Sequence, residues 1–210
     1  MTRLWLPVLL AAAVVGVAVG AGIALFSRSS PKPSNDAAGP VATWAAGARP
    51  APAFALQDQH GSPISLASLH GRPVLLTFLD PLCRDVCPFQ AAALERAAEK
   101  LPAATRPVVV AISVNRWGNA RAYLDADVSR WHLGTTFRWA VGSPAALAQV
   151  WRDYSIGVKA TTKTVAGVTT HTITHTLATY VVDAKGDERA LVLWPFSVDR
   201  LAAVVARANP

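Results

Sequence analysis

The chain has 210 residues, of which 52% are hydrophobic and 16% charged, and its formal net charge is +7. This composition excludes a disordered or fibrous protein, and the length allows one domain of ordinary size with an appendage. The basic residues are spread along the chain without a cluster or a recognition motif, so we expect no nucleic-acid partner. The two cysteines are too few for a disulfide scaffold, which leaves them for redox or metal chemistry.

The amino terminus contains an uncharged apolar stretch at residues 4–26. A helix of about 20 such residues can span a bilayer. A cleaved signal peptide normally has a shorter apolar region, about 7–15 residues, and a small-residue cleavage site. We therefore predict an uncleaved transmembrane anchor at residues 1–27. Residues 28–52 are rich in Pro, Ala, Gly and Ser, which predicts a flexible linker to a folded domain at residues 53–210.

The rest of the chain alternates predicted strands and helices. We expect a hairpin at 54–56 and 64–66, a strand at 74–78, a helix from Pro88 to about 101, a strand at 108–114, a helix near 119–125, a strand at 137–141, a helix at 144–154, strands at 172–182 and 189–193, and a last helix from 198 to about 207, capped by Ser197. This order predicts a thioredoxin-like α/β fold, with a mixed central sheet flanked by helices and an N-terminal transmembrane helix.

Cys83 and Cys87 stand four residues apart in the sequence CRDVC, between the strand at 74–78 and the helix from Pro88. Active groups of α/β units lie where a strand's carboxyl end meets the next helix. The helix dipole and the adjacent Arg84 favour thiolates, so the pair is predicted to be reactive rather than inert and buried. Thioredoxins use C-x-x-C, one residue shorter, whereas soft thiolates suit copper(I), with which imidazole is compatible.

Five histidines are candidates for a further ligand. His60 and His70 lie in turns ahead of the cysteine loop and are expected at the surface, and His132 lies in a polar stretch without an evident partner. His171 and His175 lie around the start of the strand at 172–182, and in this fold the loop before that strand faces the cysteine loop. In an extended segment, at about 3.3 Å per residue, the two are some 13 Å apart, so only one of them can be a direct ligand.

Three segments of the chain are similar to known sequences: FLDPLCRDVCP at 78–88, WRDYSI at 151–156 and HTLATYVVD at 175–183. Together they resemble the Sco/SenC family of thioredoxin-like copper proteins, and the resemblance extends over roughly residues 54–207. It implies that Cys83 and Cys87 are a redox-active pair and that the metal ligands are Cys83, Cys87 and His175. On this reading, replacing His171 by alanine leaves metal binding nearly unchanged.

The resemblance also implies a function. Sco/SenC proteins are tethered to membranes, bind copper and help to assemble the copper centre of cytochrome c oxidase. We therefore expect a copper chaperone rather than an enzyme, with copper as its metal and the copper-receiving subunit of the oxidase as its partner. The expected location is the cell membrane, as a single-pass protein whose C-terminal domain lies on the extracytoplasmic side.

The chain departs from the family pattern at VNRWG, residues 114–118, where an Asp-Pro and further acidic residues are usual. This leaves the client protein open. The main alternative is a membrane-tethered thiol–disulfide oxidoreductase, because the same two sulfurs serve both tasks. A peroxiredoxin is disfavoured, since Asp80 and Arg84 stand three residues before the cysteines where a Thr or Ser is needed. A partner-binding domain without chemistry is disfavoured by the intact cysteines and histidine.

Overall fold

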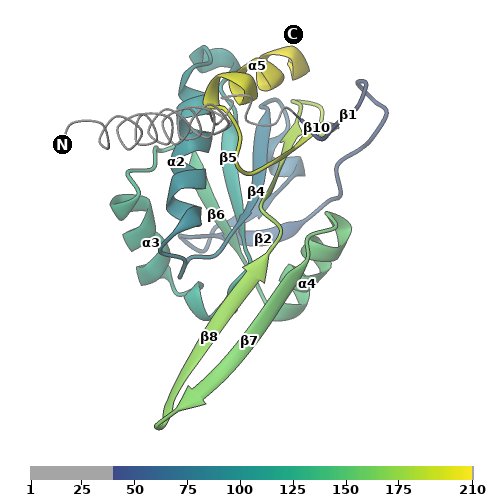
Figure 1. Cartoon of the computed structure of the whole chain (residues 1–210). Helices are drawn as coiled ribbons and strands as arrows, with labels where there is room; N and C mark the ends of the chain where they lie inside the picture. Colours follow the sequence, from purple (N-terminus) through teal and green to yellow (C-terminus); the bar gives the residue numbers. More distant parts are fainter. Residues whose placement is uncertain (1–39, 210) are drawn as a thin grey trace, which may run out of the picture. The chain divides into compact units, whose positions relative to one another are not determined.

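The computed structural model describes residues 40–209. Its strands are β1 (Ala42–Thr43), β2 (Ala55–Asp58), β3 (Pro63–Ser65), β4 (Val74–Leu79), β5 (Val108–Ser113), β6 (Phe137–Val141), β7 (Val158–Val165), β8 (Val168–His175), β9 (Ala178–Val182) and β10 (Glu188–Leu193). Eight of them form one mixed sheet in the order β1-β10-β9-β4-β5-β6-β2-β3 (Figure 1). Within it β4, β5 and β6 are parallel and the other neighbours are antiparallel.

Helices cover both faces of this sheet. They are α2 (Val86–Glu99), α3 (Arg121–Arg130), α4 (Pro144–Asp153) and α5 (Val198–Ala208), with short 3-10 turns at η2 (Ala67–Leu69), η3 (Ala103–Thr105) and η4 (Arg116–Gly118). α2, α3 and α5 share one apolar core with Leu75 and Leu79 of β4, whereas α4 shares a second core with Leu76 and Phe78. β4 and β5 are buried along their whole length, as expected of central parallel strands. The predicted α/β fold of thioredoxin-like type is confirmed.

The start of α2 differs from the prediction. The helix begins at Val86, two residues before Pro88, because Oδ1 of Asp85 accepts a hydrogen bond from the backbone N of Val86 (2.7 Å) and caps it. As a result Cys87 lies inside the first helical turn, whereas Cys83 remains in the loop before it. The two sulfurs therefore have different backbone environments.

The predicted linker at 28–52 is too long at its carboxyl end. Residues 41–51 belong to the folded domain: β1 pairs with β10, and Arg49 forms an ion pair with Glu188, whose side chain is fully buried. This pairing covers the outer edge of β10, which would otherwise expose unpaired backbone groups. The predicted anchor at 1–27 and the first part of the linker lie outside the described residues. Between residues 40 and 209 no helix has the length and apolar character that a membrane span requires.

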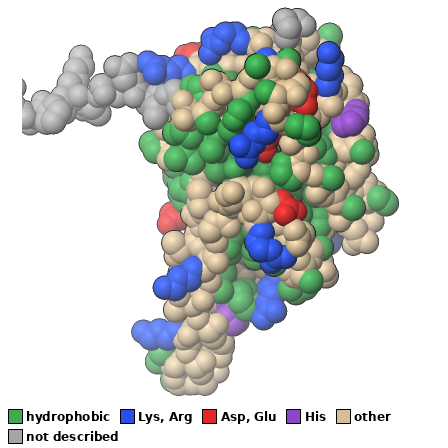
Figure 2. Space-filling view, turned by 90° about the vertical axis from the view of Figure 1, so that its right-hand side faces the viewer, with side chains coloured by type: hydrophobic (Ala, Val, Ile, Leu, Met, Phe, Trp, Pro, Cys, Tyr) green, Lys and Arg blue, Asp and Glu red, His purple; other side chains and the backbone are tan. Residues whose placement is uncertain are grey.

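A two-stranded antiparallel sheet, β7–β8, projects from the domain where the sequence predicted only a strand at 172–182 (Figure 1). Its register runs from Val158 opposite His175 to Val165 opposite Val168, and the turn residues Ala166 and Gly167 both have positive φ. The single strand predicted at 172–182 is thus divided into β8 and β9. Most hairpin side chains are exposed, so no alternation of apolar residues marked it in the sequence. Figure 2 shows basic side chains on this projection, and residues 158–176 contain no acidic residue.

Candidate metal centre

The cysteine loop joins β4 to α2 and is fixed from the side of β5. Oδ1 of the buried Asp80 accepts hydrogen bonds from the backbone N of Leu82 (2.7 Å) and from Nδ2 of Asn115 (2.8 Å). Asn115 itself is buried. Gly118 packs directly on the loop, since a Cβ there would lie 2.9 Å from Cβ of Pro81. The segment in which the chain departs from the family pattern therefore supports the cysteine loop.

Arg84 is held by its own loop and by α3. Its guanidinium donates to the carbonyls of Pro81 (3.1 Å) and Cys83 (2.9 Å) and lies 3.5 Å from Oδ1 of the buried Asp127. Burial raises the pKa of Asp127 to about 6, although Arg84 and Arg130 act in the opposite direction. Arg84 thus fixes the backbone of the loop, and it is not among the groups that shift the pKa of either thiol.

The two cysteines carry free thiols in different surroundings. Cys83 is partly exposed and Cys87 is fully buried. Sγ of Cys83 accepts a hydrogen bond from the backbone N of Cys87 (3.3 Å) and lies 2.8 Å from Oδ1 of Asp85. The hydrogen bond from the Cys87 thiol lowers the pKa of Cys83, whereas the same bond and burial raise the pKa of Cys87. Cys83 is therefore the sulfur that loses its proton first.

His175 ends β8 beside the cysteines. Its Nδ1 lies 3.1 Å from the backbone O of Thr176. Because a carbonyl can only accept, Nδ1 carries the proton and Nε2 keeps its lone pair. Nε2 lies 4.0 Å from Sγ of Cys87. Burial lowers the pKa of His175, which keeps the imidazole neutral at neutral pH. A neutral imidazole with its second nitrogen bonded to a carbonyl is the usual state of a histidine ligand.

Two of the three predicted ligands, Cys87 and His175, already lie at the separation of ligands that share one metal ion, whereas Cys83 does not yet complete the set. With bond lengths of about 2.3 Å to sulfur and about 2.0 Å to nitrogen, as in zinc sites, two ligands of one ion lie roughly 3.5–4 Å apart. The distance from Cys87 to His175 fits this range. Among residues 40–209, no three His, Cys, Asp or Glu side chains are already grouped as a complete set of ligands. Cys83 is the group that must turn, since its thiol is bonded to Asp85. These donors otherwise fit a soft thiophilic ion.

The structure separates the two histidines that the sequence left as candidates. His171 lies four residues before His175 on β8. Its ring stacks on the ring of Trp117, with centroids 3.8 Å apart and planes 7° apart. It lines a cavity of about 380 Å³ together with Cys83 and Asp85. The other three histidines are exposed, as predicted for His60 and His70. The stack on Trp117 was not predicted from the sequence, although the repeat His-Thr-Ile-Thr-His places both histidines on one face of a strand.

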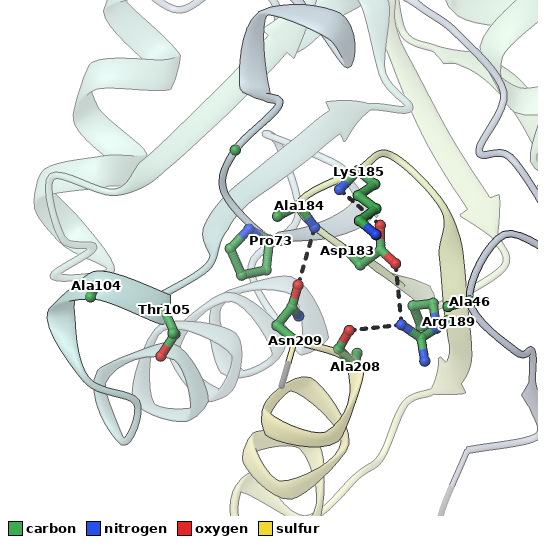
Figure 3. Close-up of a pocket in the computed structure, with 11 residues that line it drawn as sticks. Ala46, Pro73, Ala104, Thr105, Asp183, Ala184, Lys185, Arg189, Ala208 and Asn209 are labelled. Carbon is green, nitrogen blue, oxygen red and sulfur yellow. Dashed lines mark hydrogen bonds and ion pairs between the residues drawn. The ribbon is translucent and has the colours of Figure 1, made fainter.

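A second cavity, of about 330 Å³, lies at the opposite ends of β4 and β9 and contains no sulfur or histidine (Figure 3). Two of its charged groups, Arg189 and Asp183, form an ion pair with each other. The guanidinium of Arg189 bonds to Asp183 (3.2 Å) and to the carbonyl of Ala208 (2.8 Å), and Asn209 accepts from the backbone N of Ala184 (3.1 Å). These hydrogen bonds connect the end of α5 to the β9–β10 turn and to β10.

The fold and the site define a class: a thioredoxin-like domain with a C-x-x-x-C loop and a distal histidine. A family model described as SCO1/SenC matches residues 44–208, and the chain belongs to this family. This confirms the resemblance seen in the sequence. Among curated protein sequences no match is found.

Solved structures are similar to the domain. ScoI of Bradyrhizobium japonicum with copper bound is 26% identical, with a TM-score of 0.63 over 75% of this chain and 98% of that chain. ScoI of Arabidopsis thaliana with copper bound is 21% identical, with a TM-score of 0.67 over 75% and 96%. BsSco, described as a member of the Sco family of cytochrome c oxidase assembly proteins with a disulfide switch, is 20% identical, with a TM-score of 0.60 over 82% and 96%.

Proposed function

We propose that this protein is a membrane-tethered copper(I) carrier that delivers copper to, or matures, the copper centre of cytochrome c oxidase. One observation carries the proposal most directly: Nε2 of His175, with its lone pair free, faces Sγ of Cys87 at 4.0 Å. Two soft sulfurs and one neutral imidazole are donors suited to copper(I). Copper in the solved structure of the 26%-identical ScoI supports the choice of metal.

The three donors differ in whether they must lose a proton before they bind the ion. Cys83, partly exposed and with a lowered pKa, supplies the first thiolate. Cys87 keeps its proton in the metal-free protein because burial and Cys83 raise its pKa, so its proton leaves only when a cation replaces it. His175 needs no deprotonation, because burial already holds it neutral. Copper uptake is thus coupled to the release of thiol protons.

Anaerobic titration with copper(I) tests the proposal. The solved relatives match this domain over 96–98% of their own chains, and we therefore expect residues 40–210 to fold by themselves. We expect the reduced domain to bind one copper ion per molecule and the disulfide form to bind none, because oxidation removes both thiolates. A chelator of matched affinity gives the binding constant. Equal uptake by the reduced and the disulfide form would rule out the cysteines as ligands.

A second function is favoured by the difference between the thiols. A partly exposed thiol with a lowered pKa beside a buried one suits thiol–disulfide exchange. In this reaction the Cys83 thiolate attacks a client disulfide and releases one client thiolate, forming a mixed disulfide. Cys87 then attacks Cys83, releasing the second client thiol and leaving the disulfide Cys83–Cys87. The client gains two electrons, which the domain loses. His175 has no required part in this exchange.

The proposed location is the cell membrane, with residues 1–27 as a single-pass anchor and the domain outside the cytoplasm. The support is the uncharged stretch at 4–26 and the need of the thiol pair for a compartment in which it can be oxidised. A phosphatase reporter that is active only outside the cytoplasm, fused after Pro210, is expected to be active. Activity only of a reporter that requires the cytoplasm would contradict this location.

A further inference from the structure

The β7–β8 hairpin is attached to the domain mainly through one face of β8. Along this strand His171, Ile173 and His175 are partly buried, whereas the residues between them are exposed. No strand of the hairpin pairs with the main sheet. An isolated two-stranded hairpin is marginally stable in water. Its position relative to the cysteine loop therefore depends on the side chains of this inward face.

The inward face of β8 contacts the domain through the stack of His171 on Trp117. The rings are nearly parallel at 7°, with centroids 3.8 Å apart. Each of the two stacked residues also makes a polar contact within its own segment or hairpin. The backbone N of Trp117 donates to Oδ1 of Asn115 (3.0 Å), and Nδ1 of His171 lies 3.0 Å from Oγ1 of Thr162 on β7. The guanidinium of Arg116 lies 4.6 Å from the centroid of the Trp117 ring. Asn115 in turn bonds to Asp80 of the cysteine loop.

This chain of contacts links the cysteine loop to β8 by a route that does not pass through the metal site. It runs from Asp80 through Asn115 and Trp117 to His171, four residues before His175. A shift of β8 at His171 would be carried along the strand, and the Nε2 of His175 would move away from Cys87.

We propose that Trp117 and His171 are positioning residues: their stacked rings seat β8 on the domain and hold His175 beside Cys87, which sets the affinity for copper(I). This rests on the proposed function, and it replaces the sequence-based expectation that removal of His171 has almost no effect. In this role the ring of His171 matters and its free nitrogen does not. The alternative, that His171 binds the metal directly, is separated from it by the test.

The test compares variants of the domain of residues 40–210 in copper(I) affinity. Trp117→Ala and His171→Ala remove the stack and are expected to weaken affinity roughly three- to tenfold, the worth of an aromatic pair. His171→Phe keeps an aromatic ring without a nitrogen and should stay within about twofold of the unchanged domain. Tyr123→Ala, at an exposed aromatic residue of α3, is the matched control and should have no effect.

A second readout needs no copper. In the metal-free reduced domain, amide hydrogen exchange of β7 and β8 is expected to be faster in Trp117→Ala and His171→Ala and unchanged in His171→Phe. Unchanged exchange and affinity in Trp117→Ala would overturn the proposal. A loss of affinity in His171→Phe as large as in His171→Ala would also overturn it, because the stacked ring would then not be what positions β8. If the unchanged domain bound no copper, the carrier function would fail, whereas the exchange experiment would still decide whether the stack seats β8.

Discussion

Serine in place of Cys83 or Cys87 is expected to lower the copper(I) affinity of the reduced domain by at least roughly 100-fold, the upper end of what changing a partner of a metal ligand costs. Each substitution removes a soft anionic donor and leaves a hydroxyl that stays protonated. The measurement is competition with a chromophoric copper(I) chelator under anaerobic conditions. Thr174→Ser, at an exposed neighbour of His175, serves as the control.

The two serine variants should also differ in a second respect. Cys87 is fully buried in the first turn of α2 and belongs to an apolar core, so serine there places a hydroxyl among apolar groups, whereas Cys83 is partly exposed. We expect thermal unfolding to be lowered more by Cys87→Ser than by Cys83→Ser. Binding of copper by either variant with unchanged affinity would contradict the assignment of that sulfur.

His175→Ala separates copper delivery from thiol exchange in cells. A carrier needs two thiolates and the imidazole together, whereas a thiol reductase needs only the two sulfurs. In copper-starved cells we expect His175→Ala to reduce cytochrome oxidase activity nearly as much as the double serine variant, and added copper to restore part of it. Oxidase activity is measured in membranes of each strain, with protein levels checked by blotting.

The exposed His132 provides the matched control, since His132→Ala should leave oxidase activity unchanged. Full oxidase activity with His175→Ala, beside none in the cysteine variant, would assign the protein to thiol–disulfide exchange. Equal activity in all strains would exclude cytochrome oxidase as the client. The sequence leaves the identity of the client protein open because of the segment around Asn115 and Trp117.

The sequence was sufficient to predict the central strands, and the structure places His175 beside Cys87, whereas Cys83, Cys87 and His175 as the complete set of ligands stays a prediction. β4 and β5 are mostly apolar runs, and Ser197 caps α5 as predicted, because these signals are local. The linker boundary was wrong because β1 is two residues long and depends on β10 for its pairing.

The β7–β8 hairpin and its attachment could not be predicted from local signals. Its strands are mostly exposed and rich in threonine, so they lack the apolar alternation by which half-buried strands are recognised. The stack of Trp117 on His171 joins residues 54 positions apart and follows from tertiary packing alone. Sequence spacing predicted that only one of the two histidines is a direct ligand. The structure places the other one, His171, against the ring of Trp117.

X-ray absorption at the copper edge of the reduced, copper(I)-loaded domain tests whether Cys83, Cys87 and His175 bind the ion. We expect two sulfur donors, from Cys83 and Cys87, and one nitrogen donor in the first coordination sphere. The nitrogen should be absent from the spectrum of His175→Ala and retained in that of His171→Phe. A spectrum with sulfur donors only, or one whose nitrogen persists in His175→Ala, would contradict the assignment of His175 as the third ligand.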